Sequence, residues 1–260
     1  MKVKVIAAIV IIAVVIPPLY LGGWALQVLL WVIAAGAAYE SAKLVSRKRD
    51  ILGTVLNLAA ILAMFYVPET YYAAAVSIWL VVLFTIEILK GKVATDNVVY
   101  PFAITVLTGL ALRCVGRIYN NPDWTGWLVM LYVALACYLC DTGAYFFGVA
   151  FGKHKMIPEV SPHKTWEGSI GGYVSGLIGS LLLGLLCLKN LPSSLIIAGS
   201  FILPAVAQIG DLSFSSIKRR FGIKDFSNLI PGHGGILDRV DSIIFCLMMF
   251  NALLIIWGIA

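Results

Sequence analysis

The stretch SSIKRRFGIKDFSNLIPGHGGILDRVD, residues 215–241, places eight charged side chains in 27 positions. Apolar runs at about 193–214 and 241–259 flank it, and a membrane-spanning helix needs roughly 20 mostly apolar residues. A connection that only joined two spans would need neither three consecutive cations nor a glycine-rich turn. We therefore interpret this stretch as an active-site loop at a membrane surface, with phosphate chemistry as its purpose.

The composition of the whole chain agrees with that interpretation. Hydrophobic residues make up 61% of the sequence, charged residues 12%, and the mean hydropathy is +0.96, whereas soluble domains carry about 25% charged residues. We predict an all-α integral membrane protein with about nine transmembrane helices. The candidate spans cover about residues 3–21, 24–46, 51–67, 70–90, 98–118, 124–150, 168–188, 193–214 and 241–259.

No long linker or soluble insertion interrupts these spans, so we expect one membrane domain over residues 1–260. Residues 1–130 are mostly apolar and are expected to form scaffold and lipid-facing helices. The catalytic half, residues 131–260, holds both polar loops. Glycines Gly172 and Gly176 in the seventh span allow another helix to approach closely, either within the monomer or in a dimer contact.

Lysines and arginines indicate the orientation, because they collect in cytoplasmic loops. With nine spans and a cytoplasmic N-terminus, sixteen of the nineteen fall on the inner side. We predict a multi-pass protein of the inner (plasma) membrane whose active-site loops face the cytoplasm. The net charge of +6 suits anionic lipid, and no motif for nucleic acid is present.

Acidic residues inside or beside the spans are candidates for a metal site, because an intramembrane carboxylate costs at least about 2.5 kcal/mol and needs a reason. Asp211 lies about two helical turns before the cations of the loop. Asp238 and Asp241 are three residues apart, a spacing that brings side chains onto one helix face. Oxygen ligands of this kind suit magnesium, although acids near a helix N-terminus also favour the macrodipole.

Two further acids leave their purpose open. Glu87 near a helix end is interpreted as reaching to the membrane surface. Glu40 has Lys43 one turn later, so a structural ion pair and a place in the site are both compatible with the sequence.

The glycine-rich turn at residues 231–235 cannot be ordinary helix, and its successive N–H groups can form an anion-binding nest. We expect His233 to donate to a phosphate or to orient the turn. Substrate is also expected to contact Asp225, Gly234 and Gly235. The cations that would neutralise phosphate charge are Lys218, Arg219, Lys224 and Arg239.

The earlier polar segment, residues 141–168, has the same character, and its length and glycines suggest a folded cover. Lys164 and Glu167 are candidates for contacts with phosphate, ribose or a metal network, with a surface ion pair as the alternative. The other candidate substrate contacts in this segment are Asp141, Ser161 and Thr165.

At residues 215–241 the pattern S-x-I-K-R-x4-K-D-x-S-x2-I-P-x-H-G-G-I-x-D-R-V-D resembles the signature of phosphatidate cytidylyltransferases, also called CDP-diacylglycerol synthases. S-P-x-K-T-W-E-G at residues 161–168 and D-x-x-A-Y at residues 141–145 are similar to the same family. The resemblance extends over effectively the whole chain.

This resemblance implies that CTP and phosphatidic acid react to give CDP-diacylglycerol and pyrophosphate in phospholipid biosynthesis. It also implies a homodimer, magnesium as the divalent ion and potassium as a candidate monovalent ion. Family metal ligands correspond to Asp211 and Asp238. The catalytic residues expected on this basis are Asp211, Asp238, Lys218, Arg219, His233 and Arg239.

Three other functions are compatible with parts of the pattern. A CTP-dependent polyprenol or phytol kinase would release CDP, and a cytidylyltransferase of ether lipids would release pyrophosphate. An ion-coupled transporter could bury Asp141, Asp211 and Glu40 along a cation pathway.

Overall fold

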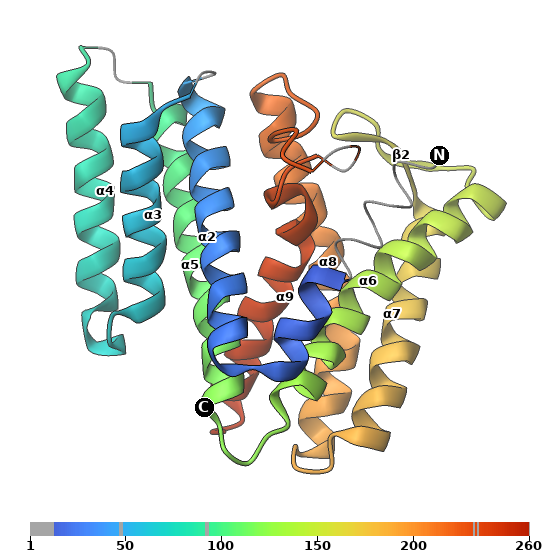
Figure 1. The fold of residues 1–260 in the computed structure, drawn as a ribbon. Helices are drawn as coiled ribbons and strands as arrows, with labels where there is room; N and C mark the ends of the chain where they lie inside the picture. The colour runs from blue at the N-terminus through green and yellow to red at the C-terminus, as the bar shows by residue number, and fades with distance from the viewer. Residues whose placement is uncertain (1–12, 47–48, 92–93, 231, 233, 260) are drawn as a thin grey trace. The chain divides into compact units, whose positions relative to one another are not determined.

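The computed structural model describes residues 13–46, 49–91, 94–230, 232 and 234–259. Most of these residues are helical, which confirms the prediction of an all-α integral membrane protein (Figure 1). The elements are α2 (Gly23–Ser46), α3 (Ile51–Tyr66), η1 (Glu69–Tyr71), α4 (Tyr72–Leu89), α5 (Asp96–Asn120), α6 (Gly126–Phe151), β1 (Lys155–Ile157), β2 (Ser161–Thr165), α7 (Trp166–Cys187), α8 (Ser193–Arg220) and α9 (Leu237–Ile256).

Seven helices among the described residues are long and apolar enough to cross a membrane: α2, α4 with η1, α5, α6, α7, α8 and α9. The predicted span at 51–67 corresponds to α3, which has 16 residues and is therefore short for a complete crossing. The predicted span at 3–21 lies largely outside the described residues. The count of nine spans and the orientation stay predictions.

The chain divides into two compact units, each assembled from separate stretches of sequence. The first unit consists of Met1–Arg113 and Asp225–Arg239, and the second of Cys114–Lys224 and Val240–Ala260. The expected single membrane domain, with a scaffold before residue 130, stays a prediction. The two units are described one at a time below.

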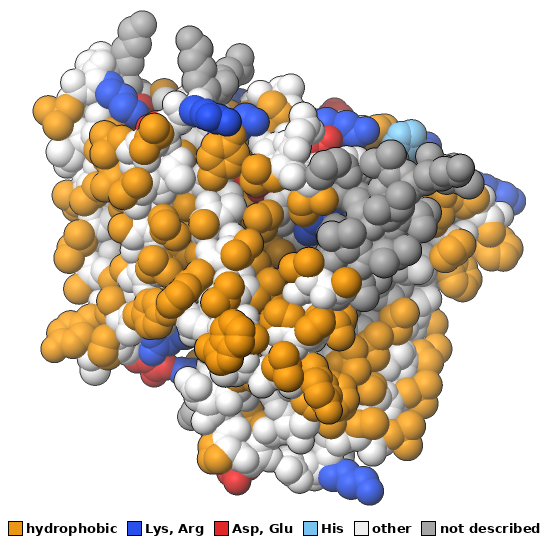
Figure 2. Space-filling model, viewed as in Figure 1, with side chains coloured by type: hydrophobic (Ala, Val, Ile, Leu, Met, Phe, Trp, Pro, Cys, Tyr) orange, Lys and Arg blue, Asp and Glu red, His pale blue; other side chains and the backbone are white. Residues whose placement is uncertain are grey.

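In the first unit α2, α3, α4 and α5 run side by side (Figure 1). An apolar cluster of Ala60, Met64, Trp79, Leu83 and Val98 joins α3, α4 and α5. On the face shown in Figure 2, hydrophobic side chains cover most of the length of these helices, and Lys and Arg side chains lie toward the ends. That distribution is the one a bilayer requires.

Glu87 differs from its sequence-based interpretation. Its side chain is buried, and it accepts hydrogen bonds from Lys90 Nζ at 2.7 Å and from Asn97 Nδ2 at 3.1 Å. Because both partners satisfy the carboxylate within the protein, Glu87 does not need to reach the membrane surface. It instead fastens the end of α4 to the beginning of α5.

In the second unit α6, α7 and α8 pack against one another. Glycines in α7 make the close approach possible: a Cβ on Gly172 would lie 2.5 Å from the carbonyl oxygen of Cys140, and one on Gly176 would lie 2.6 Å from that of Ala136. The two glycines therefore serve packing within the chain. A dimer contact stays a prediction.

Between α6 and α7 the chain folds into an antiparallel hairpin, in which Lys155 pairs with Thr165 and Ile157 with Ser161. The hairpin ends where α7 begins, and Thr165 Oγ1 caps that helix by accepting the N–H of Gly168 at 3.2 Å. The segment that we expected to be folded is thus folded. Whether it covers a substrate stays a prediction.

Candidate active site

The residues that the sequence predicts as functional fall into two groups, one in each unit. In the second unit are Asp141, Ser161, Lys164, Thr165, Glu167, Asp211, Lys218, Arg219, Lys224 and Asp241. In the first unit are Asp225, Gly234, Gly235, Asp238 and Arg239. His233 lies outside the described residues.

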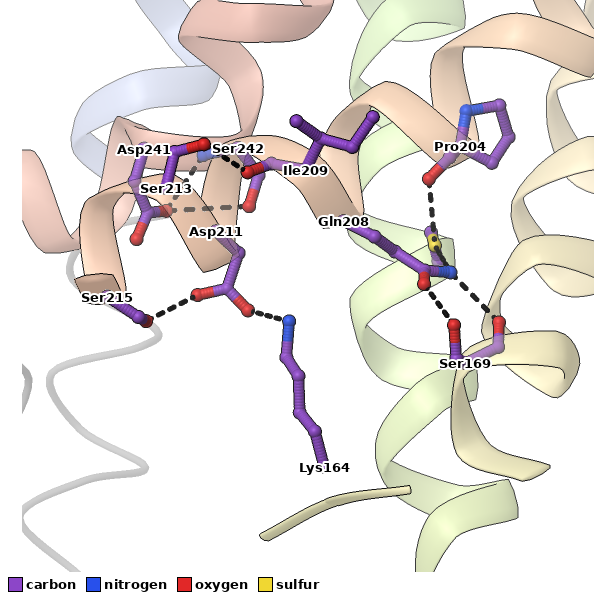
Figure 3. Close-up of polar contacts among 11 residues, drawn as sticks. Lys164, Ser169, Pro204, Gln208, Ile209, Asp211, Ser213, Ser215, Asp241 and Ser242 are labelled. Atoms are coloured by element: carbon purple, nitrogen blue, oxygen red, sulfur yellow. Dashed lines mark hydrogen bonds and ion pairs between the residues drawn. The ribbon is translucent and has the colours of Figure 1, made fainter. Parts of the chain in front are cut away.

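The first group centres on Asp211, on the cytosol-directed half of α8 in the predicted orientation. Lys164 from β2 places its ammonium group on Asp211 Oδ2 (Figure 3). Ser215, one turn later on α8, donates to Asp211 Oδ1 at 3.4 Å. The two side chains of the ion pair are 26% and 28% exposed, so water and solutes can reach it.

Asp241 in α9 extends this group. Its side chain is buried, it accepts the N–H of Ser242 at 2.8 Å, and it lies within electrostatic range of Asp141, Asp211 and the buried Lys218. We call Asp141, Lys164, Asp211, Lys218 and Asp241 the Asp211 cluster. Its three acids and two ammonium groups combine the two kinds of charge that a site for a metal ion and phosphates requires.

The donor chemistry of the Asp211 cluster fits magnesium. All its acidic donors are carboxylate oxygens, and Asp211 already holds a cation, the Lys164 ammonium. Among the residues that the structure describes, no three His, Cys, Asp or Glu side chains converge into a ready metal site. Magnesium commonly binds through one or two carboxylates and completes its shell with waters and substrate phosphates, so an incomplete protein shell suits it.

The hairpin that carries Lys164 is fixed by two side chains of the predicted site. Glu167 accepts the N–H groups of Lys153 and His154 at 3.1 and 3.2 Å and meets His154 Nδ1 at 2.6 Å. Arg219 donates from Nε to the carbonyl of Val160 at 3.1 Å. Both residues therefore hold the hairpin in this structure, and their contact with substrate stays a prediction.

A polar network that the sequence analysis missed lies one turn before Asp211. Gln208 donates to the carbonyl of Ser169 at 2.9 Å and to Cys140 Sγ at 3.2 Å, and its own Oε1 accepts from Ser169 Oγ (Figure 3). This network joins α6, α7 and α8. A glutamine inside an apolar helix is the signal that could have identified it.

The second group is the loop from residue 225 to residue 237, at the start of α9. Asp238 Oδ2 accepts two backbone N–H groups, from Phe226 and Gly235, each at 2.9 Å. Within the loop Ile230 donates to the carbonyl of Gly234 at 2.9 Å. Gly234 has φ +82°, a conformation that only glycine adopts easily. Asp238 therefore closes the loop.

Glu40, in α2, makes the contacts that the sequence least foretold. Its side chain is fully buried, Oε1 accepts from Ser227 Oγ at 2.5 Å and Ile236 N at 2.8 Å, and Oε2 accepts from Leu237 N at 2.7 Å. These bonds, and not an ion pair with Lys43, account for its burial. The N–H groups it binds directly follow the 231–235 turn, and the binding of a substrate anion by that turn stays a prediction.

The fold and these groups define a class of protein. A multi-pass membrane protein that brings acids and ammonium groups together in one partly exposed cluster has the charged groups of an enzyme that acts on phosphates.

Comparison with known proteins specifies the class further. The chain belongs to the cytidylyltransferase family, which it matches over residues 2–257, and it is a nucleotidyltransferase. Over 258 residues it is 34% identical to a phosphatidate cytidylyltransferase of Staphylococcus haemolyticus (strain JCSC1435), with 98% of this chain and 99% of the relative covered. Over 259 residues it is 33% identical to the protein of that name from Staphylococcus aureus (strain COL), with the same coverage.

Proposed function

We propose that this protein transfers the CMP group of CTP to phosphatidic acid, giving CDP-diacylglycerol and pyrophosphate for phospholipid biosynthesis. The similarity to phosphatidate cytidylyltransferases over 98% of the chain carries this proposal. The Asp211 cluster supports it, because its charges suit two phosphorylated substrates.

The nucleophile is the phosphate monoester of the lipid. Its second pKa is about 6, so most of it is dianionic at neutral pH. One of its oxygens attacks the α-phosphorus of CTP, a new P–O–P link forms, and the bond from the α-phosphorus to the bridging oxygen of the β-phosphate breaks. Pyrophosphate leaves with that electron pair. No strong general base is needed, and the difficulty is to bring two polyanions together in line.

Residues of the chain address that difficulty by charge. Lys164 and Lys218 supply ammonium groups, and Lys164 has a flexible stem that lets it exchange Asp211 for a phosphate oxygen. Asp211 would hold the magnesium ion, with Asp241 in support. When bound, the ion would supply positive charge that neutralises the phosphates and polarises the α-phosphorus. Because preorganised charge is usually the largest catalytic term, the Asp211 cluster is proposed as the centre of the reaction.

The remaining assignments rest on the family resemblance. Asp238 is proposed as the second magnesium ligand, and Arg239, Arg219 and Lys224 as phosphate-binding cations. His233 is proposed to donate to phosphate. Substrate contacts are proposed for Ser161, Thr165, Glu167, Asp225, Gly234 and Gly235, and potassium as an accompanying ion.

The setting of the reaction is also a proposal. The bias of Lys and Arg toward one side favours the inner membrane with the active site facing the cytoplasm, where CTP is available. Phosphatidic acid then enters from the cytoplasmic leaflet. The enzyme is proposed to act as a homodimer.

The test is a reconstituted reaction with purified protein in detergent, CTP labelled at the α-phosphorus, magnesium and phosphatidic acid. We expect pyrophosphate together with labelled lipid, and neither when any one component is omitted. Release of CDP without labelled lipid would identify a lipid kinase. If no product formed in any combination, a transporter would become the favoured function, which is tested by measuring flux across sealed vesicles.

A further inference from the structure

We propose that Glu40 is a positioning residue for the reaction, a tether on α2 that holds the 225–237 loop and the first turn of α9 in their working conformation. This inference rests on the proposed function. It concerns a helix that the sequence analysis assigned to the scaffold half of the chain.

The contacts of Glu40 are those of an end cap supplied by another helix. The first N–H groups of an α-helix have no partner within the helix, and a negative charge near them is favourable. Glu40 binds the N–H groups of Ile236 and Leu237, at the beginning of α9, at 2.8 and 2.7 Å. It also binds Ser227 on the opposite side of the loop. One carboxylate thus joins both ends of the loop.

The shape of α2 around Glu40 is matched to the loop. Gly36 lies one turn before Glu40 on the same face, and a Cβ there would lie 2.1 Å from Ile236 Cδ1. On the loop side, a Cβ on Gly235 would lie 2.2 Å from Glu40 Oε1. Glycine at both positions therefore leaves the space that the contact between Glu40 and the loop requires, and a larger residue at either position would collide with its partner.

The tether bears on the chemistry through the residues that directly follow it. Asp238 and Arg239 are the next residues of α9, and Asp238 itself accepts the N–H groups of Phe226 and Gly235. Glu40 and Asp238 therefore fix the same loop from two sides. If Glu40 no longer accepts these hydrogen bonds, the positions of the N–H donors in the loop and the orientation of Asp238 change together. This change affects stabilisation of the transition state more than it affects substrate affinity.

The discriminating variant is Glu40→Gln, which keeps the volume but turns one acceptor oxygen into an NH2 group that faces the N–H and hydroxyl donors. We expect kcat to fall about 30-fold with the KM for CTP changed less than about 2-fold. Hydrogen exchange is expected to accelerate in peptides covering residues 225–239 and to stay unchanged elsewhere.

Glu87→Gln is the matched control, because Glu87 is a buried acid of the same unit that accepts hydrogen bonds from Lys90 and Asn97, two side chains outside the loop. It should leave kcat and loop exchange within about 2-fold of wild type.

Three outcomes for Glu40→Gln would overturn the proposal: loop exchange like that of wild type, faster loop exchange with unchanged kcat, or faster exchange throughout the chain. The last would make Glu40 a residue of general stability. A wild-type protein that does not transfer CMP would refute the proposed function itself, whereas an active wild type with an equally active variant would refute only the positioning role.

Discussion

Carboxylates serve opposite purposes in the two polar regions of this protein. Around the 225–237 loop, Glu40 of α2 and Asp238 of α9 accept backbone N–H groups. A backbone donor cannot leave its acceptor without unfolding the loop. In the Asp211 cluster, Asp211 meets the side chains of Lys164 and Ser215, which can rotate away. Carboxylates of the first kind therefore fix the conformation of the loop. Those of the second kind pair with side chains that a substrate or an ion can replace.

The largest effect is expected for Asp211, a carboxylate whose side-chain partners a substrate or an ion can replace. Asp211→Asn keeps the size of the side chain but removes its charge, so we expect turnover to fall by at least about 100-fold, near 2.7 kcal/mol of barrier. Pyrophosphate release measures it. Ser213→Ala, on the same helix, removes only a hydroxyl bonded to the carbonyl of Ile209 and should not change the rate. A variant that retained more than about a tenth of the activity would contradict the metal assignment.

Lys164→Met tests the partner of Asp211. Methionine preserves the apolar stem but leaves Asp211 without the ammonium group, so we expect about a 30-fold loss of kcat/KM for CTP. Lys155→Met, which changes an exposed lysine of the same hairpin, is the matched control. Equal losses in the two variants would show that general positive charge, and not the ion pair, is what matters.

Gly235→Ala tests the carboxylates that fix the conformation of the loop, here Glu40. The new Cβ would lie 2.2 Å from Glu40 Oε1, so the loop must shift, and we expect about a 10-fold loss of kcat. Glu40→Asp combined with Gly235→Ala withdraws the carboxylate by one methylene and should recover part of that loss. If the two changes combined additively in kinetic assays, the close contact would not be the cause.

The smallest effect is expected for Thr165→Ala, which removes the cap of α7. Loss of such a cap costs about 1 kcal/mol, so we expect the melting temperature to drop by about 2–4 °C. Thr165→Ser keeps the hydroxyl and should restore the melting temperature. A large loss of activity without a change in melting would instead favour the predicted contact of Thr165 with substrate.

The sequence was sufficient for the fold class because apolar length is a local property. It also named each member of the Asp211 cluster as a candidate site residue, since acids and cations crowd near apolar spans, and their shared role in catalysis stays a prediction. It could not show that Lys164 pairs with Asp211, because β2 and α8 are separate in sequence and meet only through packing in the second unit.

The use of Glu40 and Glu87 was beyond sequence reasoning for a related physical reason. A buried carboxylate needs partners, and the nearest lysine in sequence is the obvious candidate. A sequence shows which side chains are present but not where backbone N–H groups will lie in the fold, and it is backbone N–H groups that hydrogen-bond to Glu40. Glu87 does use its neighbour Lys90, but Asn97 completes the arrangement from the next helix.

The tether at Glu40 has a consequence for how the protein is made. Its donors Ser227, Ile236 and Leu237 follow it by 187, 196 and 197 residues. Because a chain leaves the ribosome N-terminus first, α2 is inserted while those donors are still unsynthesised. The nascent protein therefore carries an unsatisfied acid inside a span until translation is almost complete. A chain truncated before residue 225 would never gain these partners for Glu40.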